Sequence, residues 1–210
     1  MKKRIAFLML ATALSLSLVA CGGGASTGSG SGSSDTSGNT SSSQSSASVQ
    51  GLTEAIAEQP ILLTSSGQSA DYQIVGTVLK NLGLDYTMEA TATELGDAKT
   101  LMIAVGGSSK GLGAAGIDAD QELERITALI DAADSAGLTI ITLHTGGSTR
   151  RGDLSDQFIT PSFEKADYAI VVKEGDQDGM MAGICSENGI PADMIDSVTD
   201  LTTVIPVAFK

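Results

Sequence analysis

The chain has 210 residues, and its 25 acidic residues against 12 basic ones give a net charge of −13. With only 3% aromatic residues, it lacks both the cationic surface and the stacking side chains that nucleic-acid binding requires. Its two cysteines, Cys21 and Cys185, are too few for a disulfide-rich scaffold, so we expect a fold that depends on a hydrophobic core.

The first residues have the pattern of an export signal. Three basic residues at positions 2–4 precede an apolar run that ends at Ala20, is short for a membrane span and is followed by glycine and serine. Small residues before Cys21 complete the bacterial lipoprotein signal, in which this cysteine is acylated, as by palmitate. We expect residues 1–20 to be a signal peptide and Cys21 to anchor the protein to the cell membrane, facing outside the cytoplasm. The alternative is an ordinary secreted protein.

Residues 21–50 are expected to be a lipid-anchored tether. Of the 29 residues from 22 to 50, 22 are Ser, Gly or Thr and only Asp35 is charged. Such a segment cannot bury enough apolar surface to offset the entropy of ordering, so we expect disorder and an r.m.s. reach of about 30 Å. Residues 51–210 then form a single domain with nine basic and 24 acidic residues, a net charge of −15.

Within residues 51–210, short apolar runs alternate with stretches of helical periodicity. The expected elements are, in chain order, a strand at 61–64, a helix at 70–81, a strand at 84–88, a short helical turn at 93–98, a strand at 101–105, the longest helix at 118–136, a strand at 138–143, a helix at 155–163 that Pro161 interrupts or shifts, a strand at 168–172, a helix at 178–188, a short strand at 193–195 and a last helix from 201 to Pro206. Asp118 and Gln121 have the spacing of a capping box, and glycines follow several helices.

These elements predict the fold class. The strands are continuous apolar runs, which is typical of a sheet that is covered on both faces. Strand–helix–strand repetition implies right-handed crossovers between parallel strands. We therefore predict a three-layer α/β fold with a mostly parallel sheet of five or six strands. The arrangement is Rossmann-like, and the strand order that we expect is flavodoxin-like.

Three loop segments carry a family resemblance: LTSSGQSAD at 63–71, GGSSKGLGAAGID at 106–118 and HTGGSTRRG at 144–152. Together they resemble an uncharacterised bacterial family that is known only as a domain of unknown function, with many exported or lipid-anchored members. The resemblance covers about residues 60–200. It implies the fold and the location, and it implies no catalytic residues.

The loops that follow the expected strands form the candidate binding edge, because ligands of open parallel sheets bind outside the carboxyl ends of the strands. These loops are rich in Gly, Ser and Thr, and they contain four of the domain's nine basic residues. Helix N-termini at the same edge favour anions, so we expect a small polar or anionic ligand there. The candidate ligand-binding residues are Ser66, Gln68, Asp71, Gly107, Ser108, Lys110, Gly111, His144, Gly146, Gly147, Arg150 and Arg151.

The cations at this edge allow two interpretations. If Lys110, Arg150 and Arg151 await an anionic ligand, they are free in the unliganded protein. Otherwise carboxylates neutralise them, and Asp118 and Asp153 are the candidates, although both are also placed to cap helices. Polar connections with glycine turns and no ligand are the plainer alternative.

Cofactors and metals are not expected. Gly107, Gly111 and Gly113 match a dinucleotide fingerprint, but they follow the third strand instead of the first, and the segment 106–117 is better interpreted as a loop that carries Lys110. Acidic residues at 174–178 resemble the start of a calcium loop, but its twelfth position is Cys185 instead of glutamate. Asp178 is better interpreted as a helix cap.

Three functions follow from this interpretation. The first is a membrane-anchored lipoprotein that binds a small molecule and hands it to an envelope protein partner. The second is a structural or interaction lipoprotein without a small-molecule site. The third is an extracytoplasmic hydrolase that uses a serine with His144, the only histidine, but no nucleophile-elbow pattern supports it. Catalysis is therefore the least favoured of the three.

Overall fold

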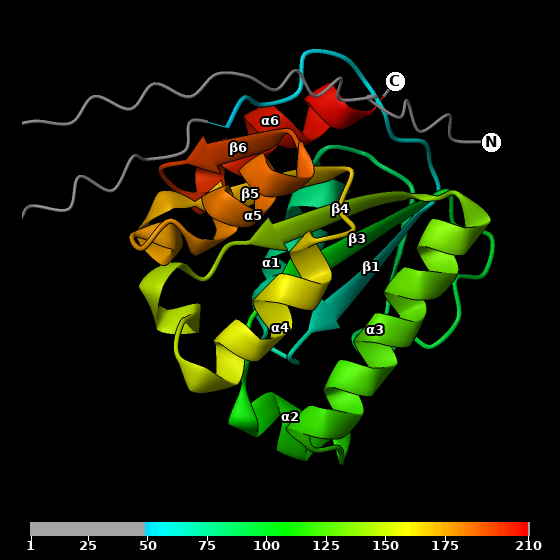
Figure 1. The fold of residues 1–210 in the computed structure, drawn as a ribbon. Coiled ribbons are helices and arrows are strands. Elements are labelled where there is room, and N and C mark those ends of the chain that lie inside the picture. Colours follow the sequence, from blue (N-terminus) through cyan, green and yellow to red (C-terminus); the bar gives the residue numbers. More distant parts are fainter. Residues whose placement is uncertain (1–48, 210) are drawn as a thin grey trace, which may run out of the picture. The chain divides into compact units, whose positions relative to one another are not determined.

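The computed structural model describes residues 49–209 (Figure 1). The expected signal peptide, Cys21 and the tether up to residue 48 lie outside the described residues. Gln50, which we had assigned to the tether, contacts the domain, because its carbonyl oxygen accepts a hydrogen bond of 3.0 Å from the amide of Ala192. No helix among residues 49–209 has the length and apolar character needed to cross a membrane.

One sheet forms the centre of this part of the chain, and its strands are parallel in the order β2-β1-β3-β4-β5-β6. The strands are β1 (Ile61–Ser66), β2 (Tyr86–Met88), β3 (Thr100–Val105), β4 (Thr139–His144), β5 (Tyr168–Val172) and β6 (Ala192–Ile195). The predicted α/β class and the flavodoxin-like order are confirmed. Every residue of β1, β3 and β5 is buried, which explains why these strands are continuous apolar runs instead of alternating ones.

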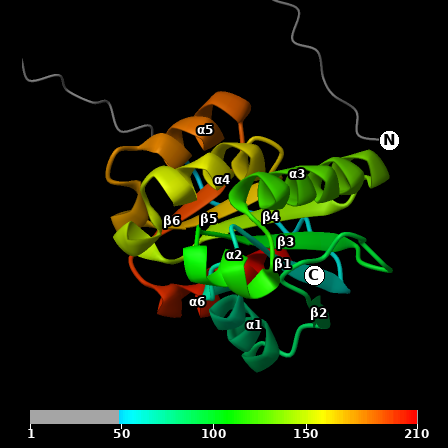
Figure 2. The same cartoon turned by 90° about the horizontal axis from the view of Figure 1, so that it is seen from below.

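Helices cover both faces of the sheet. The α-helices are α1 (Asp71–Asn81), α2 (Ser109–Ala115), α3 (Ala119–Ala136), α4 (Asp153–Phe163), α5 (Met180–Asn188) and α6 (Leu201–Ala208). Three short 3₁₀ helices are η1 (Gly147–Arg150), η2 (Lys173–Asp176) and η3 (Val198–Asp200). Figure 2 shows α3, α4 and α5 on one side of the sheet, with α1 and α6 on the other. A separate hydrophobic cluster fills each side, which confirms the three layers.

Helix α3 begins and ends as the sequence predicts. The Asp118 carboxylate accepts from the amide of Gln121 at 2.8 Å, and the Gln121 side chain accepts from the amide of Asp118 at 3.0 Å. This reciprocal pair satisfies two amides that the first turn leaves without helical partners. Gly137 ends the helix with a φ of 72°, in the left-handed conformation that glycine adopts without strain.

Four local predictions were wrong. Residues 93–98 form no helix, because Gly96 has a φ of 56° and breaks the helical conformation. The segment 106–117, which we expected to be a loop, contains α2. Ser108 caps the start of this helix, because its hydroxyl oxygen accepts a hydrogen bond from the amide of Gly111. Helices α4 and α6 continue through Pro161 and Pro206, where packing of their buried faces outweighs the lost hydrogen bond.

Candidate functional site

A crevice opens at the carboxyl edge between β1 and β3. The chain leaves β1 toward β2 on one side and comes back to β3 on the other, so the connections diverge at this point. Such a topological switch point is where open α/β sheets bind ligands. The crevice has a volume of about 530 Å³, within the range of small-molecule sites. It is lined by Gln68, Ala70, Tyr72, Gln73, Ala90, Thr91, Ser108, Lys110, Gly111, Ala114 and Ala115.

The two walls of the crevice approach each other closely at Gln68 and Gly111. Gln68 has a φ of 59°, which is unusual for a residue other than glycine, and it forms an isolated antiparallel bridge with Gly107. A Cβ atom on Gly111 would lie 1.8 Å from the carbonyl oxygen of Gln68. Only glycine therefore allows α2 to lie this close to the loop after β1.

A buried carboxylate holds the Gln68 wall in place. Glu122 of α3 is fully buried, and its Oε1 accepts from the amide of Gly67 at 2.9 Å and from Nε2 of Gln68 at 3.0 Å. The same Nε2 donates to the carbonyl oxygen of Ala90 at 2.9 Å. One carboxylate thus orders the loops after β1 and β2. Sequence reasoning missed Glu122, although it precedes Ile126 by four residues and so lies on the buried stripe of α3.

Arg125 neutralises Glu122 inside the protein. Its Nε donates to Oε2 and its Nη2 to Oε1, both at 2.8 Å. The guanidinium also donates to the carbonyl oxygens of Ala92 and Ser65, each at 2.6 Å. The ion pair therefore ties α3 to β1 and to the segment after β2, and it forms the rigid support beneath the crevice.

Arg150 is paired with a carboxylate of the chain itself. Its Nε lies 3.0 Å from Oδ2 of Asp71, and that oxygen also accepts from the hydroxyl of Ser69 at 3.0 Å. Asp71 is buried and belongs to the first turn of α1, so the pair joins the loops after β1 and β4. Both residues were predicted to bind a ligand, and the structure places them against each other.

Arg151 is paired more extensively. It donates to both oxygens of Asp156 and of Asp178, and to the carbonyl oxygen of Gly175 at 2.6 Å. Hydrogen bonds from Arg151 lower the pKa of Asp178 to about 2. Of the two expected carboxylate partners, Asp118 instead caps α3, and no ion pair is formed by Asp153 within residues 49–209.

His144 lies at the end of β4 and is fully buried. Its Nε2 is 2.9 Å from the carbonyl oxygen of Arg150, so this nitrogen carries a hydrogen, while Nδ1 has no hydrogen-bond partner among the described residues. Burial is the main influence that lowers the pKa of His144, and the ring is therefore held neutral. Its one hydrogen bond goes to a backbone carbonyl instead of a serine hydroxyl, so the geometry of a serine–histidine pair is not formed.

Side chains of the protein cap the N-termini of α2, α3 and α5 at this edge, whereas the N-cap residues of α1 and α4 make no side-chain capping hydrogen bond. Ser108 and Asp118 accept from amides of the first turns of α2 and α3. In the first turn of α5, Asp176 accepts from the amides of Met181 and Ala182 at 2.7 and 3.0 Å, and Asp178, the cap that we expected, accepts from the amide of Met180 at 3.3 Å. These amides are the groups that would otherwise bind phosphate.

The remaining predicted residues pack inside the edge. The Ser66 hydroxyl lies 2.9 Å from that of Ser162, and the Gly107 amide donates to the Ser155 hydroxyl at 3.0 Å. A Cβ atom added to Gly146 would contact the Arg150 side chain, and one added to Gly147 would contact the Glu174 side chain. Four of the predicted binding residues therefore line the crevice, namely Gln68, Ser108, Lys110 and Gly111. The other eight, Ser66, Asp71, Gly107, His144, Gly146, Gly147, Arg150 and Arg151, do not line it.

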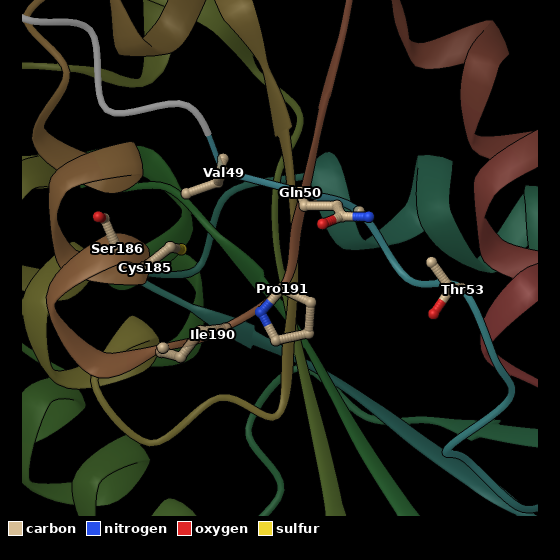
Figure 3. Close-up of a pocket in the computed structure, with 9 residues that line it drawn as sticks. Val49, Gln50, Thr53, Cys185, Ser186, Ile190 and Pro191 are labelled. Carbon is tan, nitrogen blue, oxygen red and sulfur yellow. The ribbon is translucent and has the colours of Figure 1, made fainter.

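A second hollow of about 420 Å³ lies where β6 begins (Figure 3). It is formed by residues 49–53 and the end of α5, and none of its lining residues is charged. Cys185 lies on this side, where burial raises the pKa of its thiol to about 11. A thiol with such a pKa stays protonated at neutral pH and is a poor nucleophile, which favours its interpretation as a small apolar residue.

Within residues 49–209, no group of three or more His, Cys, Asp or Glu side chains could hold a metal ion.

Comparison with protein families gives a match. A family model described as "Domain of unknown function (DUF6305)" matches residues 58–209. The match spans the chain from just before β1 to the end of α6, and it contains every residue that lines the switch-point crevice. No curated protein matches the chain.

Proposed function

The chain belongs to this family of unknown function, and we propose that it is a binding protein that holds a small molecule in the crevice between β1 and β3. The convergence of loops from β1, β2 and β3 on one hollow of about 530 Å³ at the topological switch point carries this proposal. The supporting ion pair of Glu122 and Arg125 keeps the walls of the crevice formed without ligand, as a preorganised site requires.

The chemistry of the edge favours binding over hydrolysis. His144 is neutral and buried, with its single hydrogen bond to a backbone carbonyl. Arg150 and Arg151 are neutralised by Asp71, Asp156 and Asp178, so they are not poised to stabilise developing negative charge. A structural lipoprotein without a ligand is the remaining alternative, and the size and position of the crevice favour a binding role over it.

The binding role is tested by a thermal-shift screen of the full-length protein in nonionic detergent against a library of small metabolites. A ligand that binds only the native state stabilises it by about 2.7 kcal/mol at a concentration of 100 Kd. Ala114→Phe fills the crevice from α2 and is expected to abolish the shift. Ala132→Phe, also exposed but outside the crevice on α3, is the matched control and should retain it. A shift that survives Ala114→Phe, or no hit from the library, contradicts the proposal.

The second part of the proposal concerns location. The lipoprotein pattern before Cys21 supports an acylated protein that is held at the outer face of the cell membrane, with the domain presented through the segment 22–48. Cys21→Ala is expected to remove the protein from the membrane fraction while the domain folds normally. Fractionation of cells and mass spectrometry of residue 21 measure this. A wild-type protein that is exported with an unmodified Cys21 would refute the anchor.

A further inference from the structure

We propose that the crevice takes a small organic monocarboxylate, whose carboxylate pairs with Lys110 and whose apolar body lies against the alanine side of α2. This inference rests on the proposed function, since it concerns the same crevice. It goes further by naming the chemical class of the ligand, and two properties of the site carry it: a cation that is free among the described residues, and a lining of small apolar groups.

Lys110 is the cation that stays free at this edge, among the residues that the structure describes. Among the residues that the structure describes, the other basic side chains in the loops at this edge are paired: Arg150 with Asp71, Arg151 with Asp156 and Asp178, and Lys173 with Asp196. Lys110 is exposed and has no carboxylate partner or hydrogen bond within the described part of the chain. In a domain with 24 acidic residues, a cation that lines a hollow without a carboxylate beside it is available for a negative ligand group.

Small and apolar groups line the crevice beside this charge. Ala70, Ala90, Ala114 and Ala115 present methyl groups to the crevice, and the ring of Tyr72 borders it. A flat apolar body can lie on such a surface and displace water from it. The Ser108 oxygen accepts from the Gly111 amide, so its hydroxyl hydrogen remains available to a second carboxylate oxygen.

The remaining features favour a carboxylate over a phosphate. Phosphate sites at sheet edges use several free amides at a helix N-terminus. Here Ser108, Asp118 and Asp176 accept from amides in the first turns of α2, α3 and α5, which leaves fewer of these amides for a phosphate. A single ammonium balances one negative charge, and a second charge on the ligand would meet the repulsion of a domain with a net charge of −15.

The inference is tested with three probes that share one ring, namely benzoate, benzamide and phenyl phosphate. Each is titrated into the full-length, ¹⁵N-labelled protein in nonionic detergent at pH 7, and the amide shifts of Gly111, Ala114 and Ala115 are followed by NMR. We expect all three amides to shift saturably with benzoate. Benzoate should bind about fivefold more tightly than benzamide, because a solvent-exposed ion pair contributes at most about this factor, and phenyl phosphate should bind no more tightly than benzoate.

Two lysine variants separate the possible outcomes. Lys110→Met should remove the preference for benzoate and leave the Kd of benzamide unchanged, whereas Lys80→Met, an exposed lysine at the end of α1, should change neither. Equal binding of benzoate and benzamide to the wild type overturns the inference and leaves the binding role intact. Tighter binding of phenyl phosphate, or a benzoate preference that survives Lys110→Met, also overturns it. The absence of shifts with any probe overturns the ligand class, while the binding role itself is judged by the metabolite screen.

Discussion

Replacing Arg125 with alanine is expected to lower the free energy of unfolding by about 3–5 kcal/mol, the cost of leaving one partner of a buried ion pair uncompensated. Glu122 is fully buried and loses its counter-charge in this variant. The carbonyl oxygens of Ser65 and Ala92 lose a donor at the same time. Because these contacts support the loops after β1 and β2, the walls of the crevice should loosen together with the fold.

Urea unfolding followed by circular dichroism measures this loss. The matched control is Lys165→Ala, which removes an exposed cation from the carboxylates of Asp131 and Asp134 on the same helix, α3. We expect little change in its unfolding midpoint, since water and salt screen an exposed pair. If Arg125→Ala is no more destabilised than Lys165→Ala, the pair of Glu122 and Arg125 does not support the walls of the crevice.

The second large effect is expected at Gly111. Gly111→Ala places a Cβ atom 1.8 Å from the carbonyl oxygen of Gln68, a clash with backbone that no rotamer change relieves. The loop after β1 or the start of α2 has to shift, and overpacking of this kind costs about 1–3 kcal/mol. The same shift should alter the crevice, so ligand-induced stabilisation should fall in this variant.

Gly113→Ala is the control for this second prediction. Gly113 lies two residues further along α2, and an added Cβ atom there meets nothing within 4 Å. Alanine in an open helical position stabilises by about 0.4–1 kcal/mol, because it restricts the unfolded chain. The two substitutions in one helix should therefore change stability in opposite directions. A Gly111→Ala variant as stable as Gly113→Ala would mean that α2 does not contact the loop after β1.

The architecture was largely predictable because it follows from local patterns. The apolar run at 101–105 lies in a strand that is buried along its whole length, and the capping box of Asp118 and Gln121 begins α3. Helix α2 was not predictable in the same way. Three glycines in and beside it lower its intrinsic helical tendency, and its position against Gln68 is a tertiary contact between segments more than 40 residues apart.

The sequence by itself determined the α/β class, the parallel sheet and its carboxyl edge, where we propose the site, because each depends on periodicity and on the short range of chain connections. Only the tertiary structure decided which residues of that edge remain free. Arg150, Arg151 and Lys110 look alike in the sequence. In the folded chain Asp71, 79 positions away, neutralises Arg150, and Asp156 and Asp178 neutralise Arg151, while Lys110 has no ion pair among residues 49–209. The pairing of charged side chains depends on which residues the fold brings close together. The burial of Glu122 and the close approach of Gly111 to Gln68 depend on the fold in the same way.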